Sequence, residues 1–372
     1  MKAKRVLITG GAGFVGSHTA DSLVKSGHEV CVFDSLTPQV HHGEVPYIPE
    51  GAEFIRGDVR DLANLSFAVK RADVIYHLAA AVGVGQSMYQ ISEYTATNNL
   101  GTANLFQAIL DSRAAPEKIV VASSMSIYGE GKYLCRECGE MAPQPRPLDQ
   151  LKAKNWETVC STCGESLMPV PTREEKPLQC TSIYALSKKD QEEMSLLFGR
   201  TYRIPVVALR YFNIYGTRQS LSNPYTGVCA IFASRLMNRK SPVIFEDGQQ
   251  IRDFVSVHDI VQANLLALEN SGADGKALNI GSGEPVTIKE VADELSSALG
   301  VQVPADITGK YRAGDVRHCF ADIMQASHLL GYRPRFTLKQ GMEELVTWLQ
   351  SQPAKDSVDQ AMQQLSVHGL VA

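Results

Sequence analysis

The amino-acid sequence lacks the features of a membrane protein and of a nucleic-acid-binding protein. No run of about eighteen apolar residues occurs, so we expect no segment that spans a membrane. The 36 Lys and Arg residues are outnumbered by 40 Asp and Glu residues, so no basic surface for nucleic acid is expected. The apolar stretch after Lys4 and Arg5 is too short for a signal peptide and breaks at once into glycines. We therefore expect a cytoplasmic protein of one large domain or two closely joined domains.

The N-terminal half alternates segments that are typical of strands and helices. Residues 5–9 are apolar and lead into a loop with glycines at positions 10, 13 and 16; a second apolar segment, 29–33, ends at Asp34. Glycines at this spacing allow a tight turn and let the backbone approach a pyrophosphate at the N-terminus of the next helix. The Asp34 carboxylate can then accept the ribose 2′-hydroxyl. Because no arginine follows it closely, we expect NAD rather than NADP.

Further segments have the composition of buried strands and are separated by helical stretches. They are residues 54–59, 73–80, 118–124 and 206–213. This alternation predicts an α/β fold with a Rossmann-like, doubly wound parallel sheet and ligands at the carboxyl ends of the strands. We expect the NAD-binding domain to cover residues 1–212, with 255–280 returning to it. A smaller C-terminal α/β substrate lobe would cover 213–345, and the tail 346–372 is assigned no function.

Tyr184 and Lys188 are four residues apart, which places them on one face of a helix. A phenol titrates near 10, so it becomes a useful base at neutral pH only after a pKa shift of about three units, or about 4 kcal/mol. A positive charge at about 4 Å supplies up to that free energy at an effective dielectric constant near 20. The pair can therefore carry out proton transfer, although the same spacing alone is also typical of an ordinary amphipathic helix.

Taken together, these motifs resemble the extended short-chain dehydrogenase/reductase family, in particular its NAD-dependent nucleotide-sugar epimerases and dehydratases. The resemblance covers roughly residues 4–345, interrupted by one insertion. It implies that Ser124 hydrogen-bonds the sugar oxygen, that Tyr184 exchanges its proton, and that Lys188 binds the nicotinamide ribose while lowering the pKa of the tyrosine. The positions that match cofactor-binding residues of the family are Gly10, Gly13, Phe14, Val15, Gly16, Asp34, Asp58, Val59, Leu78, Ala79, Ala80, Thr97, Tyr184, Lys188 and Phe212.

The second half resembles the substrate lobe of this family. The positions that would bind the nucleotide sugar are Val82, Ser124, Ser126, Asn213, Arg252, Arg312 and Asp315. The loop 223–228 would meet the nucleoside diphosphate. Guanidinium groups suit this task because they fork onto phosphate oxygens. Solvated surface cations are the alternative reading of the two arginines.

The residues after Ser124 narrow the reaction. In the family that this sequence resembles, 4,6-dehydratases carry Asp-Glu directly after the catalytic hydroxyl residue. Decarboxylases of that family usually carry a glutamate at the second of these two positions. Met125 and Ser126 occupy these places, so neither elimination nor decarboxylation is expected. Epimerisation at C4 needs neither acid, because the sugar is oxidised by NAD to a transient ketone and reduced again on its other face.

The sugar is indicated by the segment around Val82. The segment is apolar and small where similar hexose epimerases tend to have a lysine, which suits a methyl group at C5 of the sugar. Segments 80–89 and 122–131 resemble dTDP-L-rhamnose 4-epimerases, which interconvert dTDP-L-rhamnose and dTDP-6-deoxy-L-talose. A UDP-sugar (glucose, xylose or glucuronate) or GDP-sugar 4-epimerase, a net nucleotide-sugar oxidoreductase and a non-catalytic NAD-binding module are alternatives. The resemblance also implies a homodimer formed through the helices around Tyr184.

The insertion, residues 130–178, is rich in cysteine. It carries two Cys-x-x-Cys-Gly turns, formed by Cys135, Cys138, Cys160 and Cys163. Four thiolates at about 2.3 Å from one ion are the arrangement of a structural zinc site. The segment is short and proline-rich, so metal binding would stabilise what burial cannot. We predict a zinc knuckle; idle thiols or a redox pair are the alternatives.

Overall fold

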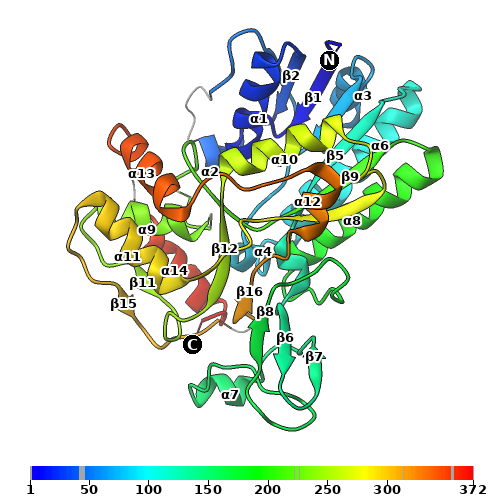
Figure 1. Ribbon diagram of the computed structural model, residues 1–372. Helices are drawn as coiled ribbons and strands as arrows, with labels where there is room; N and C mark the ends of the chain where they lie inside the picture. Colours follow the sequence, from blue (N-terminus) through cyan, green and yellow to red (C-terminus); the bar gives the residue numbers. More distant parts are fainter. Residues whose placement is uncertain are drawn as a thin grey trace.

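The computed structural model describes residues 2–41, 47–221, 223–225, 227–312, 314–352 and 356–371. Its centre is a parallel sheet of seven strands in the order β13-β9-β5-β4-β1-β2-β3 (Figure 1). The strands are β1 (Arg5–Thr9), β2 (Glu29–Asp34), β3 (Glu53–Arg56), β4 (Val74–His77), β5 (Lys118–Ser124), β9 (Val206–Tyr211) and β13 (Lys276–Ile280). Strand order reverses next to β1, so the predicted Rossmann-like, doubly wound sheet is confirmed.

Helices cover both faces of this sheet because its strands are apolar on both sides. Alternate residues of β1 point to opposite cores: Val6 and Ile8 join one buried cluster, and Leu7 joins the other. The first core is covered by α1 (Phe14–Lys25), α10 (Val257–Glu269) and α12 (Met324–Leu330). The second is covered by α3 (Leu62–Val69), α6 (Gly101–Ser112) and α8 (Ile183–Tyr202).

Short elements connect these layers near the carboxyl ends of the strands. They are α2 (Pro38–His41), α4 (Val84–Ser87), α5 (Ile91–Tyr94), the π-helix η1 (Thr95–Leu100) and the 3₁₀-helix η2 (Met125–Tyr128). The predicted strand 118–124 agrees with β5 in both of its bounds. The predicted strand 206–213 is divided, because β10 begins at Asn213 and pairs with β12 in a different sheet.

A smaller α/β part with its own apolar core lies beside the large sheet. Its strands are β10 (Asn213–Tyr215), β11 (Val243–Ile244), β12 (Ile251–Ser256), β14 (Pro285–Thr287), β15 (Asp306–Ile307) and β16 (His318–Cys319). Its helices are α9 (Val228–Met237), α11 (Ile288–Leu299), α13 (Leu338–Leu349) and α14 (Val358–Val367). Between them the chain returns to the large sheet, where β13 pairs with β9.

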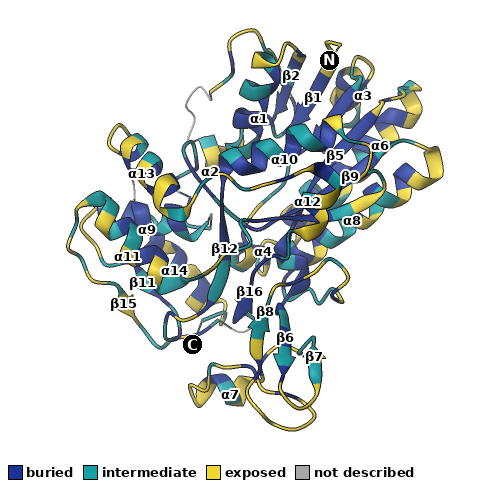
Figure 2. Ribbon diagram, in the orientation of Figure 1, coloured by how far each residue is buried: buried dark blue, intermediate teal, exposed yellow. Residues whose placement is uncertain are grey.

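The cysteine-rich insertion projects from the rest of the molecule (Figure 1). It contains a three-stranded antiparallel sheet in the order β7-β6-β8 and one short helix. Its elements are β6 (Lys132–Cys135), β7 (Gly139–Met141), α7 (Leu148–Lys152) and β8 (Met168–Val170). Figure 2 shows that much of this projection is exposed. Its buried apolar cluster is only Tyr133, Cys135, Cys160 and Leu167, with Met141 packed against it.

Among the residues that the structure describes, no helix combines the length and the apolar character that crossing a bilayer would need.

Candidate active site

A cleft of about 1440 Å³ opens where the strands of the large sheet end. The loops after β1, β2, β4, β5 and β9 all contribute to its walls. All fifteen positions that we expected to bind the cofactor line this cleft. The sequence prediction therefore placed them in one cavity, at the edge of the sheet where α/β folds bind ligands.

The glycine-rich loop fits a closely approaching dinucleotide. Gly10 has a φ of +70°, and a Cβ there would lie 2.7 Å from the backbone nitrogen of Ala79. A Cβ on Gly16 would lie 2.1 Å from the carbonyl oxygen of Gly10. Gly13 is the N-cap of α1, and within the described residues no side chain caps this helix. The first amides of α1 can therefore face an anionic group in the cleft.

Two carboxylates follow the neighbouring strands β2 and β3. Asp34 accepts hydrogen bonds from the backbone nitrogens of Ala12 at 3.1 Å and Leu36 at 2.9 Å. Asp58 is held by Arg60, whose Nη2 lies 2.7 Å from Oδ2. This contact lowers the pKa of Asp58. Both acids are thus placed at the end of the cleft nearest the glycine-rich loop.

Helix α8 presents the tyrosine–lysine pair to the other end of the cleft. Ser182 is its N-cap, and its Oγ accepts from the backbone nitrogen of Ala185 at 3.1 Å. The backbone nitrogen of Tyr184 donates to Ser87 Oγ at 3.0 Å, which fixes the first turn against the loop after β4. Ser124, the last residue of β5, lines the same cleft as Tyr184. A sugar hydroxyl in this cleft could therefore meet both groups at once.

Burial shifts the pKa values of both Tyr184 and Lys188. Burial raises the pKa of Tyr184, and Ser124 only partly opposes this. Burial also lowers the pKa of Lys188 to about 7, although Glu192 favours its charged form. Its Nζ donates to the carbonyl oxygen of Ala122 at 2.5 Å and to Gln191. Burial therefore dominates the pKa of both groups, and the lowering of the Tyr184 pKa by Lys188 remains a prediction.

A buried ion pair supports the site from behind. Arg210 on β9 lies 2.7 Å from Glu192 on α8, and both side chains are almost fully buried. Ser123 Oγ donates to the same carboxylate at 2.6 Å. Arg210 also donates to the hydroxyl of Tyr128 at 2.7 Å. These contacts join α8, β5 and β9, the elements that carry Tyr184, Ser124 and the start of the substrate side.

The predicted substrate residues fall into two groups. Val82, Ser124, Ser126 and Asn213 line the cleft, as do Asn223, Tyr225, Gly227 and Val228 of the predicted diphosphate loop. Thr226 of this loop lies outside the described residues.

Arg252, Arg312 and Asp315 form the second group, which contacts itself rather than the cleft wall. Arg312 Nη2 lies 2.8 Å from Asp315 Oδ2, and Arg252 Nη2 lies 3.6 Å from Oδ1. Arg252 also donates to the carbonyl oxygen of Val316 at 2.5 Å. These residues are not among those lining the cleft, so the structure gathers them without bringing them to its wall.

Several cleft residues were missed from the sequence. Arg218 lines the cleft, with its guanidinium 3.7 Å from the ring centre of Tyr47. Trp348, Gln352 and Ser357 also line it, although all three belong to the tail for which no function was expected. Trp348 lies on α13 and could have been noticed in the sequence, because the large apolar ring of a tryptophan usually packs against other groups.

The four predicted metal-binding cysteines come together in the insertion. Their sulfur atoms all lie within 4.8 Å of one another. Gly139 and Gly164, which follow the two pairs, have φ values of +83° and +80°. The backbone nitrogen of Thr162 points to Cys160 Sγ at 3.4 Å. The predicted cysteine cluster is therefore confirmed, and its sulfur positions fit a single ion.

Comparison with known proteins agrees with this geometry. The model of the NAD-dependent epimerase/dehydratase family matches residues 6–148 and 158–281. The chain is 33% identical to a dTDP-L-rhamnose 4-epimerase of Burkholderia thailandensis over 93% of this chain and 95% of the relative. It is also 33% identical to a putative UDP-glucose 4-epimerase of Methanocaldococcus jannaschii over 93% and 98% of the two chains.

Solved structures show the same relationship. A UDP-N-acetylglucosamine 4-epimerase from Methanobrevibacter ruminantium in complex with UDP-N-acetylmuramic acid is 29% identical, with a TM-score of 0.77 over 95% of this chain and 100% of that one. A Thermus thermophilus UDP-glucose 4-epimerase in complex with NAD is 28% identical, with a TM-score of 0.72 over 94% and 100% of the chains. The sequence motifs, the cleft and these similarities lead to one conclusion: the chain belongs to the NAD-dependent epimerase/dehydratase family.

Proposed function

We propose that this protein is an NAD-dependent 4-epimerase of nucleotide sugars and that its substrate pair is dTDP-L-rhamnose and dTDP-6-deoxy-L-talose. The observation that carries the reaction is the meeting of Tyr184 and Ser124 in a cleft whose opposite end fits a dinucleotide. Met125 and Ser126 supply no acid for dehydration or decarboxylation. The similarity to a dTDP-L-rhamnose 4-epimerase supports the sugar.

In this mechanism the residues of the chain bind, orient and move one proton. Tyr184 takes the proton of the C4 hydroxyl and later returns it, while Ser124 hydrogen-bonds the same oxygen. Bound NAD would supply the hydride acceptor for C4. Lys188 would hold the nicotinamide ribose, and Gly10, Gly13 and the first turn of α1 would hold the pyrophosphate. The other residues expected to bind the cofactor would form the walls around the NAD.

The sugar assignment depends on the wall near Val82. Its side chain lines the cleft and is 51% exposed, so an apolar group on C5 of the sugar would cover it. UDP-sugar 4-epimerisation is the second candidate, favoured by the similarity to UDP-sugar 4-epimerases. Separate incubation with dTDP-L-rhamnose, UDP-glucose and UDP-xylose, followed by resolution of the products, decides between them. Stoichiometric consumption of free NADH with a keto sugar would instead indicate a net oxidoreductase.

We also propose that the four cysteines of the insertion bind one structural zinc ion. Their sulfur atoms are close enough to surround one ion, and the four ligands leave no position open for chemistry. The buried apolar cluster of the insertion is too small to hold its loops together. Metal analysis of the purified protein should find one zinc per chain.

Finally, we propose a cytoplasmic homodimer. A shallow hollow runs between η1, α6 and α8, and it contains Leu100 and Leu197, which are 50% and 56% exposed. Apolar side chains at such exposure suit a helix-to-helix interface. Sedimentation of a Leu197→Glu variant tests this, because a charge there should give a monomer while the wild-type protein sediments as a dimer.

A further inference from the structure

The cysteine-rich insertion is placed between the two catalytic candidates. It leaves the large sheet just after η2, which follows Ser124, and it returns just before α8, which carries Tyr184. Its two ends are held together: the backbone nitrogen of Gln179 donates to the Ile127 carbonyl at 3.0 Å, and Lys176 Nζ donates to the Tyr128 carbonyl at 2.6 Å. The body of the insertion is therefore tied to the active site at its base.

The insertion also pairs with the segment 315–322 of the smaller part of the molecule. Gly131 donates from its backbone nitrogen to the His318 carbonyl at 2.8 Å. Thr172 donates to the Phe320 carbonyl at 2.8 Å and accepts from Asp322 at 3.0 Å. This segment begins at Asp315 and comes shortly after Arg312, so the insertion supports the part of the chain that carries both of these predicted nucleotide-binding residues.

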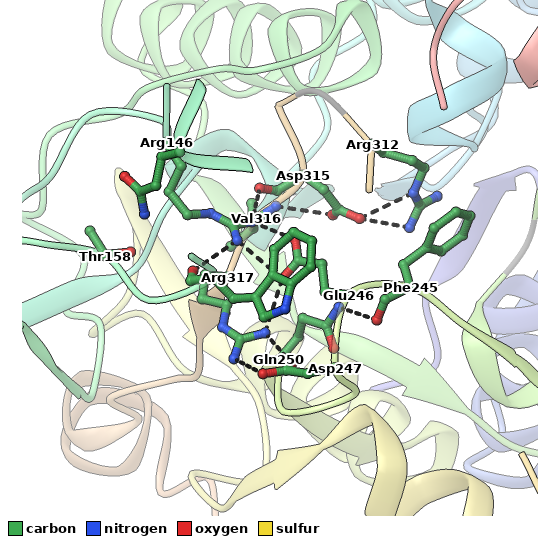
Figure 3. Close-up of polar contacts among 12 residues, drawn as sticks. Arg146, Thr158, Phe245, Glu246, Asp247, Gln250, Arg312, Asp315, Val316 and Arg317 are labelled. Atoms are coloured by element: carbon green, nitrogen blue, oxygen red, sulfur yellow. Dashed lines mark hydrogen bonds and ion pairs between the residues drawn. The ribbon is translucent and has the colours of Figure 1, made fainter. Parts of the chain in front are cut away.

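A buried ionic cluster completes this junction (Figure 3). Arg146 of the insertion forks onto Glu246, with Nη–Oε distances of 2.8 and 3.0 Å. Arg317, whose side chain is fully buried, reaches Glu246 at 2.9 Å and Asp247 at 2.7 Å. Its other nitrogen lies 2.5 Å from Glu157 of the insertion. Arg146, Glu246 and Arg317 are removed from water, so each depends on its partners for compensation, whereas Glu157 and Asp247 are partly exposed.

Two contacts connect this ionic cluster to Arg312 and Asp315. Phe245, next to Glu246 in the chain, lies under Arg312, whose guanidinium carbon is 4.7 Å from the ring centre. Arg146 Nη2 donates to the backbone carbonyl of Asp315 at 3.0 Å. Figure 3 shows Arg146 on one side of this group and Arg312 on the other, with Asp315 between them. The position of Arg312 and Asp315 is thus set by contacts that begin in the insertion.

The same segment touches the start of the catalytic helix. A Cβ on Gly314 would lie 3.4 Å from the carbonyl oxygen of Thr181, which precedes Tyr184 by three residues. Arg312 and Asp315 therefore lie on a segment that adjoins the start of α8, although neither residue lines the cleft.

We propose that the insertion positions Arg312 and Asp315 for binding the nucleoside diphosphate of the substrate, with Arg146 and Glu157 as its positioning residues. This inference rests on the proposed function, a nucleotide-sugar 4-epimerase, and on the expectation from the sequence that Arg312 and Asp315 bind the nucleotide. The metal would hold the insertion in shape, and the ionic cluster would transmit that shape to the nucleotide side. Neither Arg146 nor Glu157 touches the reacting atoms, so their loss should weaken substrate binding and leave the proton transfer itself intact.

The experiment compares full-length, metal-loaded variants by calorimetric titration with dTDP and UDP, together with KM, kcat and bound NAD. Arg146→Met and Glu157→Gln should each weaken binding of the preferred nucleoside diphosphate and raise KM by about tenfold, with NAD content and kcat unchanged. Arg146→Lys should recover only part of the loss, because an ammonium cannot fork onto Glu246. Lys152→Gln is the matched control, since Lys152 lies on α7 of the same insertion with its side chain 67% exposed.

A double variant separates positioning from general damage. Arg312→Ala should weaken nucleoside diphosphate binding by itself, and adding Arg146→Met should then cause little further loss, because both act through the same contact. Unchanged binding of dTDP and UDP in Arg146→Met would overturn the proposal. If Arg146→Met does not fold, unchanged binding in Glu157→Gln would do so instead, because Glu157 is half-exposed and its substitution is less disruptive. If the wild-type protein binds neither nucleotide, the proposed substrate class fails instead, and this result is distinct from equal binding by wild type and variants.

Discussion

The large sheet and the cysteine-rich insertion are held together by different forces. The sheet buries apolar residues on both faces between two layers of helices. The insertion buries four residues in its own cluster, and two of them are cysteines. It is fixed by arginines and carboxylates buried at its base, and a metal bound by its four clustered cysteines would add to this. A segment with too little buried apolar surface to fold alone can therefore still be anchored to a binding site by ion pairs and a metal.

The largest expected effect lies in the sheet half, at Tyr184. Tyr184→Phe removes the hydroxyl that exchanges the proton, and kcat should fall by about 10²–10⁴-fold. Bound NAD, measured after denaturation, should stay at the wild-type level because the ring remains in place. Tyr202→Phe is the control, since Tyr202 lies at the other end of the same helix and is 49% exposed. Unimpaired turnover in Tyr184→Phe would exclude the proposed mechanism.

The buried ion pair behind the site tests how far the sheet depends on charge. Glu192→Gln leaves Arg210 buried without its partner carboxylate and should lower the free energy of unfolding by about 3–5 kcal/mol, measured in urea. Glu193→Gln, on the exposed side of the same helix, should change it by less than about 0.5 kcal/mol. Equal effects of the two changes would mean that the ion pair contributes nothing beyond the surrounding packing.

Metal removal should affect the insertion and spare the sheet. Cys138→Ser should lose the bound zinc, and amide hydrogen exchange should become faster across residues 130–178. Exchange in β1, β4 and β5 should keep its wild-type rate, because those strands are stabilised by apolar packing. Cys180→Ser is the control, since Cys180 stands outside the cluster. An unchanged zinc content in Cys138→Ser would refute binding by four thiolates.

The comparison also explains what the sequence could predict. Most positions expected to bind the cofactor reach one cleft because they lie in short motifs at the ends of strands, and parallel strands bring these ends together. Thr97, Tyr184 and Lys188 reach it from helices instead. The four cysteines were found for a similar reason, since each Cys-x-x-Cys turn is local. The ionic cluster was not found, because Arg146 and Glu246 are 100 residues apart and Glu157 and Arg317 are 160 apart. Nothing in either local sequence indicates the partner.

The pKa shifts of Tyr184 and Lys188 could not be predicted from the sequence for a related reason. The four-residue spacing correctly places Lys188 beside the site, but spacing carries no information about burial. Desolvation in the folded protein raises the pKa of Tyr184 and lowers that of Lys188, opposite to what a bare charge pair at the surface would show. Residue types predict which groups meet, whereas the depth of the site decides their protonation.

This difference predicts a pH dependence of stability. The pKa of Lys188 is about 7 in the folded protein, against about 10.4 in an unfolded chain. Between these values the unfolded state binds more protons, so stability should rise with pH by up to about 1.4 kcal/mol per pH unit. Lys188→Met should lack this rise when NAD-free protein is unfolded in urea at pH 7.5 and 8.5. Lys189→Met, at the neighbouring and more exposed position, should keep it.

The smallest expected effect concerns the sugar, at the edge of the cleft. Val82 is 51% exposed, so a charge introduced there remains partly solvated and its contribution to binding is limited. Val82→Lys should shift the ratio of kcat/KM from dTDP-L-rhamnose toward UDP-glucuronate by up to about fivefold, because a lysine can pair with the carboxylate and leaves a C5 methyl group less well covered. Ile91→Lys is the control, since Ile91 is equally exposed and does not line the cleft. An unchanged ratio in Val82→Lys would show that the wall near Val82 does not select the sugar and that specificity must come from the nucleotide side, where the insertion holds Arg312 and Asp315.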